Sequence, residues 1–161
     1  MASTSESILV DLRDRLTLCH SEIAGITQSV KEFVHMPLHI GRPPLITHSI
    51  AAFDFPVVKT RSFEGTVTLN AHLYVTPLEI DRDDSDGSQG LQQVTTFINR
   101  IVDYHHKNER FATSTLGPLE NIIEPVSFSG RRFDGRDSEN NMWVAFLFQF
   151  VVTVIGYKSD A

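Results

Sequence analysis

The sequence predicts an α+β fold: a mostly antiparallel sheet with two helices packed on one face and a long C-terminal β-hairpin. Two segments with helical periodicity lie far apart in the chain, and segments with the alternation of strands lie between and after them. The longest apolar run, residues 141–157, also alternates as a strand does. Strands grouped in this way favour helices on one side of a sheet. The 161 residues predict a single domain, 1–161, that can bury a core.

The first predicted helix opens the chain. Ser3 and Glu6 have the spacing of a capping box, in which each side chain bonds a backbone N–H near the other. Gly25 has the residue type that favours a helix C-terminus, so we expect the helix to end near it. Apolar residues recur at helical spacing between these points, at Ile8, Leu12, Leu16, Cys19 and Ile23.

Two weaker strand patterns follow this helix. Residues 26–33 alternate over a short stretch, and residues 45–48, Leu-Ile-Thr-His, have the composition of a strand. Between them, Pro37, Pro43 and Pro44 argue against a regular element. We therefore expect two short strands joined by an irregular connection.

The middle of the chain predicts a long strand, an acidic loop and the second helix. Residues 63–75 alternate between apolar and polar positions, which predicts a strand with one buried face and one face in water. Residues 81–90, DRDDSDGSQG, form the acidic loop, and the helix begins near Ser88 or Gly90. The apolar stripe of this helix contains Leu91, Val94, Ile98, Ile101, Val102 and His105.

A long hairpin is predicted at the C-terminus. Residues 119–128 form its first strand, residues 129–141 a polar connection, and residues 141–157 its second strand. The even positions of the last strand are all apolar, whereas the odd positions are mixed. The run is shorter than the about 20 residues of a membrane-spanning helix and contains Gln149, so we favour a strand. Such a long strand is expected to carry a bulge, a bend or a projecting end.

Charge and cysteine content disfavour several functional classes. The net charge of −6 argues against a dedicated nucleic-acid-binding surface, which usually carries a basic patch. The single cysteine, Cys19, excludes an internal disulfide and a multi-cysteine metal site.

The N-terminal residues lack the pattern of a signal peptide, so we expect the protein to be made and folded in a cytosol.

The sequence predicts neither a metal site nor a cofactor. His35 and His39 are four apart, but Pro37 between them prevents one helix from presenting both. A calcium loop counted from Asp81 has Asp86 and Gln92 where the EF-hand pattern needs glycine and glutamate. His105 and His106 point in different directions on a helix. We interpret the seven histidines as surface or interface residues.

Catalytic patterns are also missing from the sequence, so we do not expect an enzyme. The chain has no nucleophile elbow and no phosphate-binding glycine loop. Cys19 belongs to an apolar stripe, where a thiol is normally inert. Glu64, Glu120 and Glu124 have no pattern that brings two carboxylates together, and we interpret them as surface charges.

Assembly surfaces are the better-supported prediction. The mixed face of the last strand gives four candidate subunit contacts, and the arginines of the hairpin connection give three more. The simpler reading of that connection is a solvated loop, and the alternative is a docking arm that exchanges ion pairs with a neighbour. The candidate subunit contacts are Trp143, Gln149, Val151, Thr153, Arg131, Arg132 and Arg136, and the candidate loop contacts are Asp81, Asp83, Asp84 and Asp86.

The order of elements resembles the bacteriophage tail-terminator family, also called tail-completion or minor tail proteins. The resemblance covers most of the chain as an order of elements and not as an invariant motif. The last hairpin, with its apolar final strand, completes it. The other segments that carry it are ILVDLRDRL, EIAGITQSVKEFVHMPLHIGRPPLITHS, FEGTVTLNAHLYV and GLQQVTTFINRIVDYHH.

The resemblance implies a structural virion protein that is located in the tail or neck and assembled in the host cytoplasm. Its subunits would form a ring, hexameric in the family, that caps the head-proximal end of the tail tube and stops tube polymerisation. The implied partners are further copies of the chain, the tail tube protein and a neck or head-completion protein. DNA would only pass through the lumen, and no cofactor and no membrane are implied.

Two alternatives stay open at this point. The first is a neck or head-completion ring of the connector, which shares the same plan of helices and sheet. The second is a small cytosolic α+β enzyme or ligand-binding domain. Its pocket would lie between sheet and helices, with His48, His72 or Glu64 at the mouth.

Overall fold

The computed structural model of the protein describes residues 5–31, 44–57, 59–77, 88–136, 140 and 142–157. The elements in chain order are α1 (Ser5–Ser21), β1 (Gln28–Lys31), β2 (Leu45–Asp54), β3 (Ser62–Pro77), α2 (Ser88–Lys107), the 3-10 helix η1 (Glu109–Phe111), β4 (Ile122–Arg136) and β5 (Met142–Tyr157). The predicted Ser3 of the capping box and the acidic residues Asp81, Asp83, Asp84 and Asp86 lie outside the described residues.

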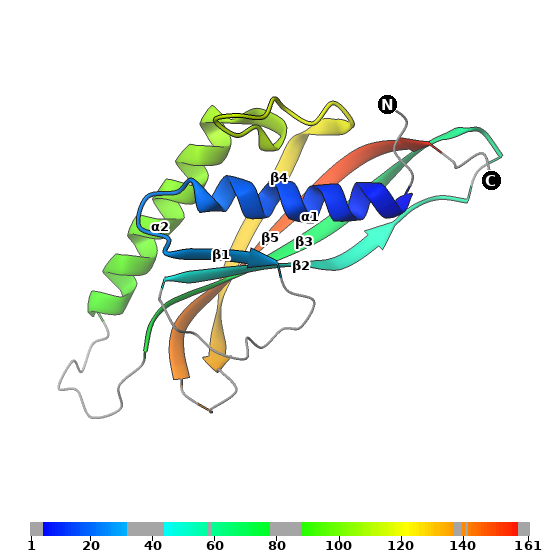
Figure 1. The fold of residues 1–161 in the computed structure, drawn as a ribbon. Coiled ribbons are helices and arrows are strands. Elements are labelled where there is room, and N and C mark those ends of the chain that lie inside the picture. The colour runs from blue at the N-terminus through cyan, green and yellow to red at the C-terminus, as the bar shows by residue number, and fades with distance from the viewer. Residues whose placement is uncertain are drawn as a thin grey trace.

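The described strands form a five-stranded sheet in the order β1-β2-β3-β5-β4. β1 runs parallel to β2, and every other neighbouring pair is antiparallel. Both helices pack against the same face of this sheet, with α1 running along the strands in Figure 1. The predicted α+β fold, with two helices on one face and a C-terminal hairpin, is confirmed.

The main core lies between the helices and this face of the sheet. The apolar stripe of α1 and most of the even positions of β5 are buried there as predicted, whereas Met142 and Phe146 are only partly buried. Phe97 of α2 is buried although the predicted stripe omitted it. Residues of α1, α2 and β5 in this core include Ile8, Leu12, Leu16, Val94, Ile101, Phe148, Phe150, Val152 and Val154.

β5 is an interior strand, because it pairs with β3 on one side and β4 on the other. The expected irregularity occurs in its partners and not in β5 itself. One register shift lies in β3 between Tyr74 and Thr76, and the other lies in β4 between Ile123 and Ser127. An extra residue bends a strand locally, so these shifts let the partners follow the long β5.

The face of the sheet opposite the helices, here called the open face, is buried at one end. Leu45, Tyr74, Trp143 and Ala145 form a second apolar cluster on it. The prediction of a uniformly wet face for β3 is therefore wrong, because Asn70, His72 and Tyr74 are buried there. Alternation predicts which residues share a face, but it does not show what covers that face.

Three predicted boundaries are corrected by the structure. α1 ends at Ser21, and Gly25 lies in the turn that follows it, with a φ of 90°. β2 runs from residue 45 to residue 54, and β4 continues to residue 136, so most of the predicted hairpin connection is strand. β4 is an edge strand, where charged and small residues are common. Because its polar composition resembles that of a loop, the full length of the strand was not predicted.

No helix among the described residues is long and apolar enough to cross a membrane.

Candidate functional site

The odd positions of β5 on the open face divide into a buried half and an exposed half. Trp143 is only 8% exposed and belongs to the second apolar cluster, so it offers little surface to a neighbouring subunit. Gln149 donates to Asn70 Oδ1 at 3.1 Å and is partly buried, as is Thr153. Val151 is exposed, and Ile155 and Tyr157 beyond it extend the apolar surface. The predicted contact surface is therefore available in the second half of the strand.

The three predicted contact arginines lie in β4 and not in a loop. Arg131 pairs with Leu147 and Arg132 with Phe146, so their side chains start from opposite faces of the sheet. Arg136 donates to Asn140 Oδ1 at 2.9 Å across the end of the hairpin. All three are exposed on the edge strand. The structure separates them, so they do not form a single patch.

The end of β2 and the connection that leads to β3 carry the two most exposed large apolar side chains among the described residues. Phe53 is 60% exposed and Val57 is fully exposed. Figure 1 shows this connection at the end of the sheet away from α2. Phe53, Phe55 and Phe63 form a row with ring centroids 5.2 and 5.1 Å apart. We call residues 53–57 and 59 the hairpin tip.

Gly65 allows the hairpin tip to pack closely on the sheet. A Cβ atom at this position would lie 2.5 Å from the Phe55 ring, which is closer than van der Waals contact allows. Because Gly65 has no side chain, the Phe55 ring can lie against the backbone of β3. The tip is thus a packed aromatic structure with Phe53 and Val57 left at its surface.

A buried chain of three histidines crosses the main core, and it was not predicted from the sequence. His20 Nδ1 lies 2.7 Å from His48 Nε2, and His20 Nε2 lies 2.9 Å from His105 Nε2. His48 Nδ1 lies 3.0 Å from the carbonyl oxygen of Val30. The chain joins α1, β2 and α2. The interpretation of all histidines as surface or interface residues is therefore wrong for His20 and His48, and also for His72 on the open face, because all three are buried.

The Val30 carbonyl fixes the direction of every hydrogen bond in this chain. A carbonyl only accepts, so Nδ1 of His48 carries the proton and its Nε2 accepts. His20 then donates from Nδ1 and accepts at Nε2. His105 donates from Nε2, which leaves its Nδ1 without a proton. We assign all three tautomers from this pattern of partners.

The surroundings favour the neutral form of all three rings. Burial, followed by the charges of His105 and His72, lowers the pKa of His48 to about 4, although the hydrogen bond to the Val30 carbonyl opposes this shift. Burial also lowers the pKa of His105 to about 4. The pKa of His20 is well below its ordinary value because burial and then His48 and His105 disfavour its charge. Phe150 packs against the rings of His20 and His105.

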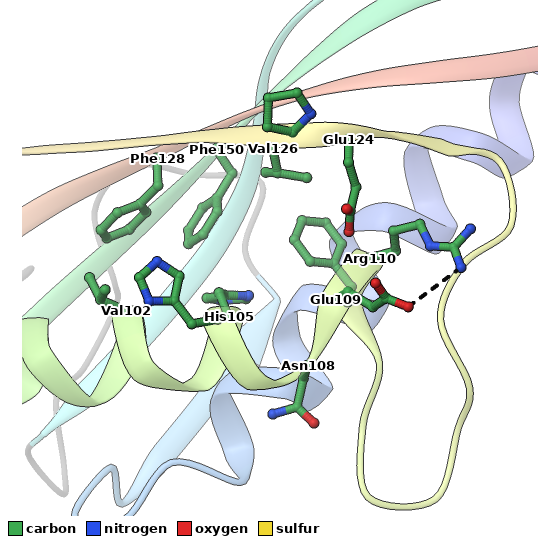
Figure 2. Close-up of a pocket in the computed structure, with 12 residues that line it drawn as sticks. Val102, His105, Asn108, Glu109, Arg110, Glu124, Val126, Phe128 and Phe150 are labelled. Atoms are coloured by element: carbon green, nitrogen blue, oxygen red, sulfur yellow. Dashed lines mark ion pairs between the residues drawn. The ribbon is translucent and has the colours of Figure 1, made fainter.

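His105 is also part of the wall of a pocket of about 410 Å³ between α2, η1, β4 and β5. Figure 2 shows Phe128 and Phe150 pointing from the strands toward Val102 and His105 of α2. Residues 124–126, which cause the register shift in β4, form another wall. Glu109, Arg110 and Glu124 are its charged residues, and Arg110 pairs with Glu109 at 3.8 Å.

The segment that closes this pocket has an unusual backbone. Arg110 and Phe111 both have positive φ, 48° and 58°, in the left-handed region that few non-glycine residues adopt. Phe111 is buried, and Arg15 Nη1 donates to its carbonyl oxygen at 3.3 Å and to that of Gly117 at 2.6 Å. The pocket wall is therefore held in place by α1.

The described residues contain no group of three or more His, Cys, Asp or Glu side chains that could hold a metal ion. The nitrogens of the histidine chain are 2.7 and 2.9 Å apart, which is hydrogen-bond distance. Cys19 is buried as predicted, and burial raises the pKa of its thiol to about 12. His35 and His39 lie outside the described residues.

The three residues that were predicted at the mouth of a ligand pocket, His48, His72 and Glu64, do not lie together in the structure. His48 and His72 are buried on opposite faces of the sheet, and Glu64 is exposed at the other end of β3. None of the three lines the pocket beside His105. The pocket was not predictable from these residues, because it arises where an irregular segment of β4 meets the end of α2.

A weak signal for the buried histidines was present in the sequence. His20 continues the apolar stripe of α1 one turn after Leu16, and His48 lies on the same face of β2 as Ile46 and Ile50. A polar residue in a core position is expected to have a hydrogen-bond partner.

Comparison with protein-family models and with curated proteins gave no match for this chain.

Proposed function

We propose that this chain is a structural virion protein that forms a ring, hexameric as the resemblance implies, at the head-proximal end of a phage tail tube. In this role it ends tube polymerisation and joins the tail to the neck or head. It acts as a tail terminator and not as an enzyme. Its partners are copies of itself, the tail tube protein and a neck or head-completion protein.

The observation that carries this proposal is the exposed apolar surface at one end of the sheet. Phe53 and Val57 of the hairpin tip are more than half exposed, and Val151, Ile155 and Tyr157 of β5 are between 37% and 44% exposed. Contiguous exposed apolar surface marks interaction sites on proteins. A subunit with such surfaces on both faces of its sheet suits an assembly with several neighbours.

The charge of the chain supports the same role. DNA must slide through the lumen of a tail ring, and a basic wall would hold the phosphates. The net charge of −6 gives the ring as a whole a repulsive field toward DNA. A lumen lined with arginine and lysine in the assembled ring would contradict this part of the proposal.

Light scattering and electron microscopy test the proposal together. The purified chain is mixed with a polymerising tail tube protein, and tube length and end caps are measured. We expect shorter tubes that carry a ring at one end, and a ring-sized species by light scattering with or without tubes. Unchanged tubes and a chain that binds only purified heads would instead identify a head-completion ring.

A ligand-binding domain is the second candidate, because the pocket of about 410 Å³ is large enough for a small molecule. Its aromatic residues and its two carboxylates suit an apolar cation. A thermal-shift screen with arylalkylamines, which are protonated at neutral pH, tests this reading. A rise in melting temperature that Phe128→Ala abolishes would favour it over the assembly role.

A further inference from the structure

The pocket beside His105 combines an apolar interior with acidic residues. Phe111, Phe128 and Phe150 give it aromatic walls, and Glu109 and Glu124 are exposed carboxylates. Glu109 has Arg110 as its ion-pair partner at 3.8 Å. The occupant that fits this chemistry is an apolar side chain with a cation close to it in sequence.

The hairpin tip has this combination of residues. Val57 is fully exposed, Phe53 is 60% exposed, and Lys59 follows two residues after Val57. The ring contacts between Phe53, Phe55 and Phe63 hold the tip against the start of β3. A supported tip loses less conformational freedom on binding than a free loop does, which favours its use as a contact.

We propose that the hairpin tip of one subunit inserts into the pocket of a second copy of this chain. Val57 enters between the aromatic walls, and Lys59 faces Glu124 across the contact. The inference rests on the proposed ring, and it names the pair of surfaces that joins neighbouring subunits.

The positions of the two surfaces fit a ring. The tip lies between β2 and β3, at the end of the sheet away from α2, whereas the pocket is built on the end of α2 (Figure 1). A contact between two different patches is heterologous, and it closes into a ring when the rotation between subunits allows it. A tip that met another tip would give only a two-fold dimer.

Cysteine cross-linking between two differently labelled variants tests the contact. Val57→Cys subunits are mixed with Glu124→Cys subunits in the presence of tubes, and a short bismaleimide is added. We expect mixed dimers between the two variants, because each neighbour presents its tip to the pocket beside it. Cys19 is buried, so the unmodified chain provides a low background. Val57→Cys paired with Glu120→Cys is the matched control, since Glu120 is exposed but does not line the pocket.

Charge changes without a cross-linking cysteine give the contact a quantitative test, with the fraction of the chain in rings at tube ends measured by light scattering and electron microscopy. Val57→Asp is expected to lower this fraction about tenfold, because it places a charge in the apolar contact. Lys59→Glu and Glu124→Lys are each expected to lower it about threefold, and the double change to restore it. All three residues are exposed, so folding is expected to persist, and circular dichroism checks it.

The outcomes separate this contact from the proposed function. Rings at tube ends without cross-links between residues 57 and 124 overturn the contact and leave the terminator role intact. A chain that forms no ring under any condition overturns both. Cross-links at equal yield with Glu120→Cys also overturn the contact, because the reaction would not depend on the pocket.

Discussion

His20 lies at the centre of a hydrogen-bonded chain that begins at the Val30 carbonyl and ends at His105. Each nitrogen of His20 has one partner, so the ring is fully satisfied although it is completely buried. The three residues belong to three elements, and the chain therefore fixes how α1, β2 and α2 pack together. A buried polar group that loses its partner costs about 1–3 kcal/mol.

The histidine chain predicts a loss of stability in mild acid. The folded pKa values of His48 and His105 are about 4, below the ordinary value of 6.5. Because the folded pKa is depressed, the stabilisation is complete above the unfolded pKa and is lost as the pH falls through the folded pKa. For His48 alone the shift corresponds to on the order of 3 kcal/mol between pH 7 and pH 4. Urea unfolding at several pH values measures this loss.

A control variant distinguishes the contribution of the histidine chain to this pH dependence from that of the carboxylates, whose ordinary pKa values are lower. His48→Leu is expected to flatten the dependence of stability on pH between pH 6.5 and pH 5. His106→Asn is expected to leave it unchanged, because His106 is exposed and outside the chain. An equally steep dependence in His48→Leu and in the unmodified protein would contradict the assignment.

At the scale of elements, the segment after α2 depends on α1 for its shape. Glu22 accepts from the Ser114 amide at 3.0 Å and from the Tyr104 hydroxyl at 2.8 Å. The hydrogen bonds from Ser114 lower the pKa of Glu22, so its charged form favours this arrangement. Together with Arg15, these bonds hold the wall of the pocket. The pocket is therefore formed by several elements and not by one loop.

Replacing Glu22 with Ala should loosen this segment without unfolding the sheet. The Ser114 amide loses its acceptor, so we expect its hydrogen exchange to become at least several-fold faster. Exchange at β5 amides should stay slow, because β5 is paired on both sides. Glu120→Ala, an exposed change nearby, is the matched control. Protection of Ser114 that persists in Glu22→Ala would show that other contacts hold the segment.

At the scale of the whole molecule, the sheet has one face that builds the subunit and one face that is only partly covered. The helices and the even positions of β5 form the main core. On the open face, apolar residues are buried near Trp143 and exposed near Ile155. This asymmetry along a single strand divides β5 into a folding half and a half that is available for assembly.

Two substitutions in β5 test this division. Phe148→Asp should unfold the subunit, because Phe148 is 1% exposed and a buried unpaired charge costs several kcal/mol. Thr153→Asp should leave the subunit folded, with a change in unfolding free energy of about 1 kcal/mol or less, and should reduce ring formation. Circular dichroism measures folding, and light scattering measures assembly. Equal unfolding of both variants would place Thr153 in the core instead.

Much of the fold could be predicted because periodicity depends on local sequence. The stripe of α1 and the alternation of residues 142–157 each required only neighbouring residues. The length of β4 was missed because Arg131, Arg132 and Arg136 resemble a loop in composition. The partners of His20 could not be predicted, because they lie 28 and 85 residues away in the chain.

Local patterns in the sequence are enough to predict a sheet with helices on one face and a last strand that is apolar on one side. This is possible because side chains repeat every two residues in strands and every 3.6 in helices. The three-dimensional structure was needed to show which half of the open face is covered, which histidines meet, and where the pocket lies. These features depend on contacts between segments far apart in the chain, which no local pattern records.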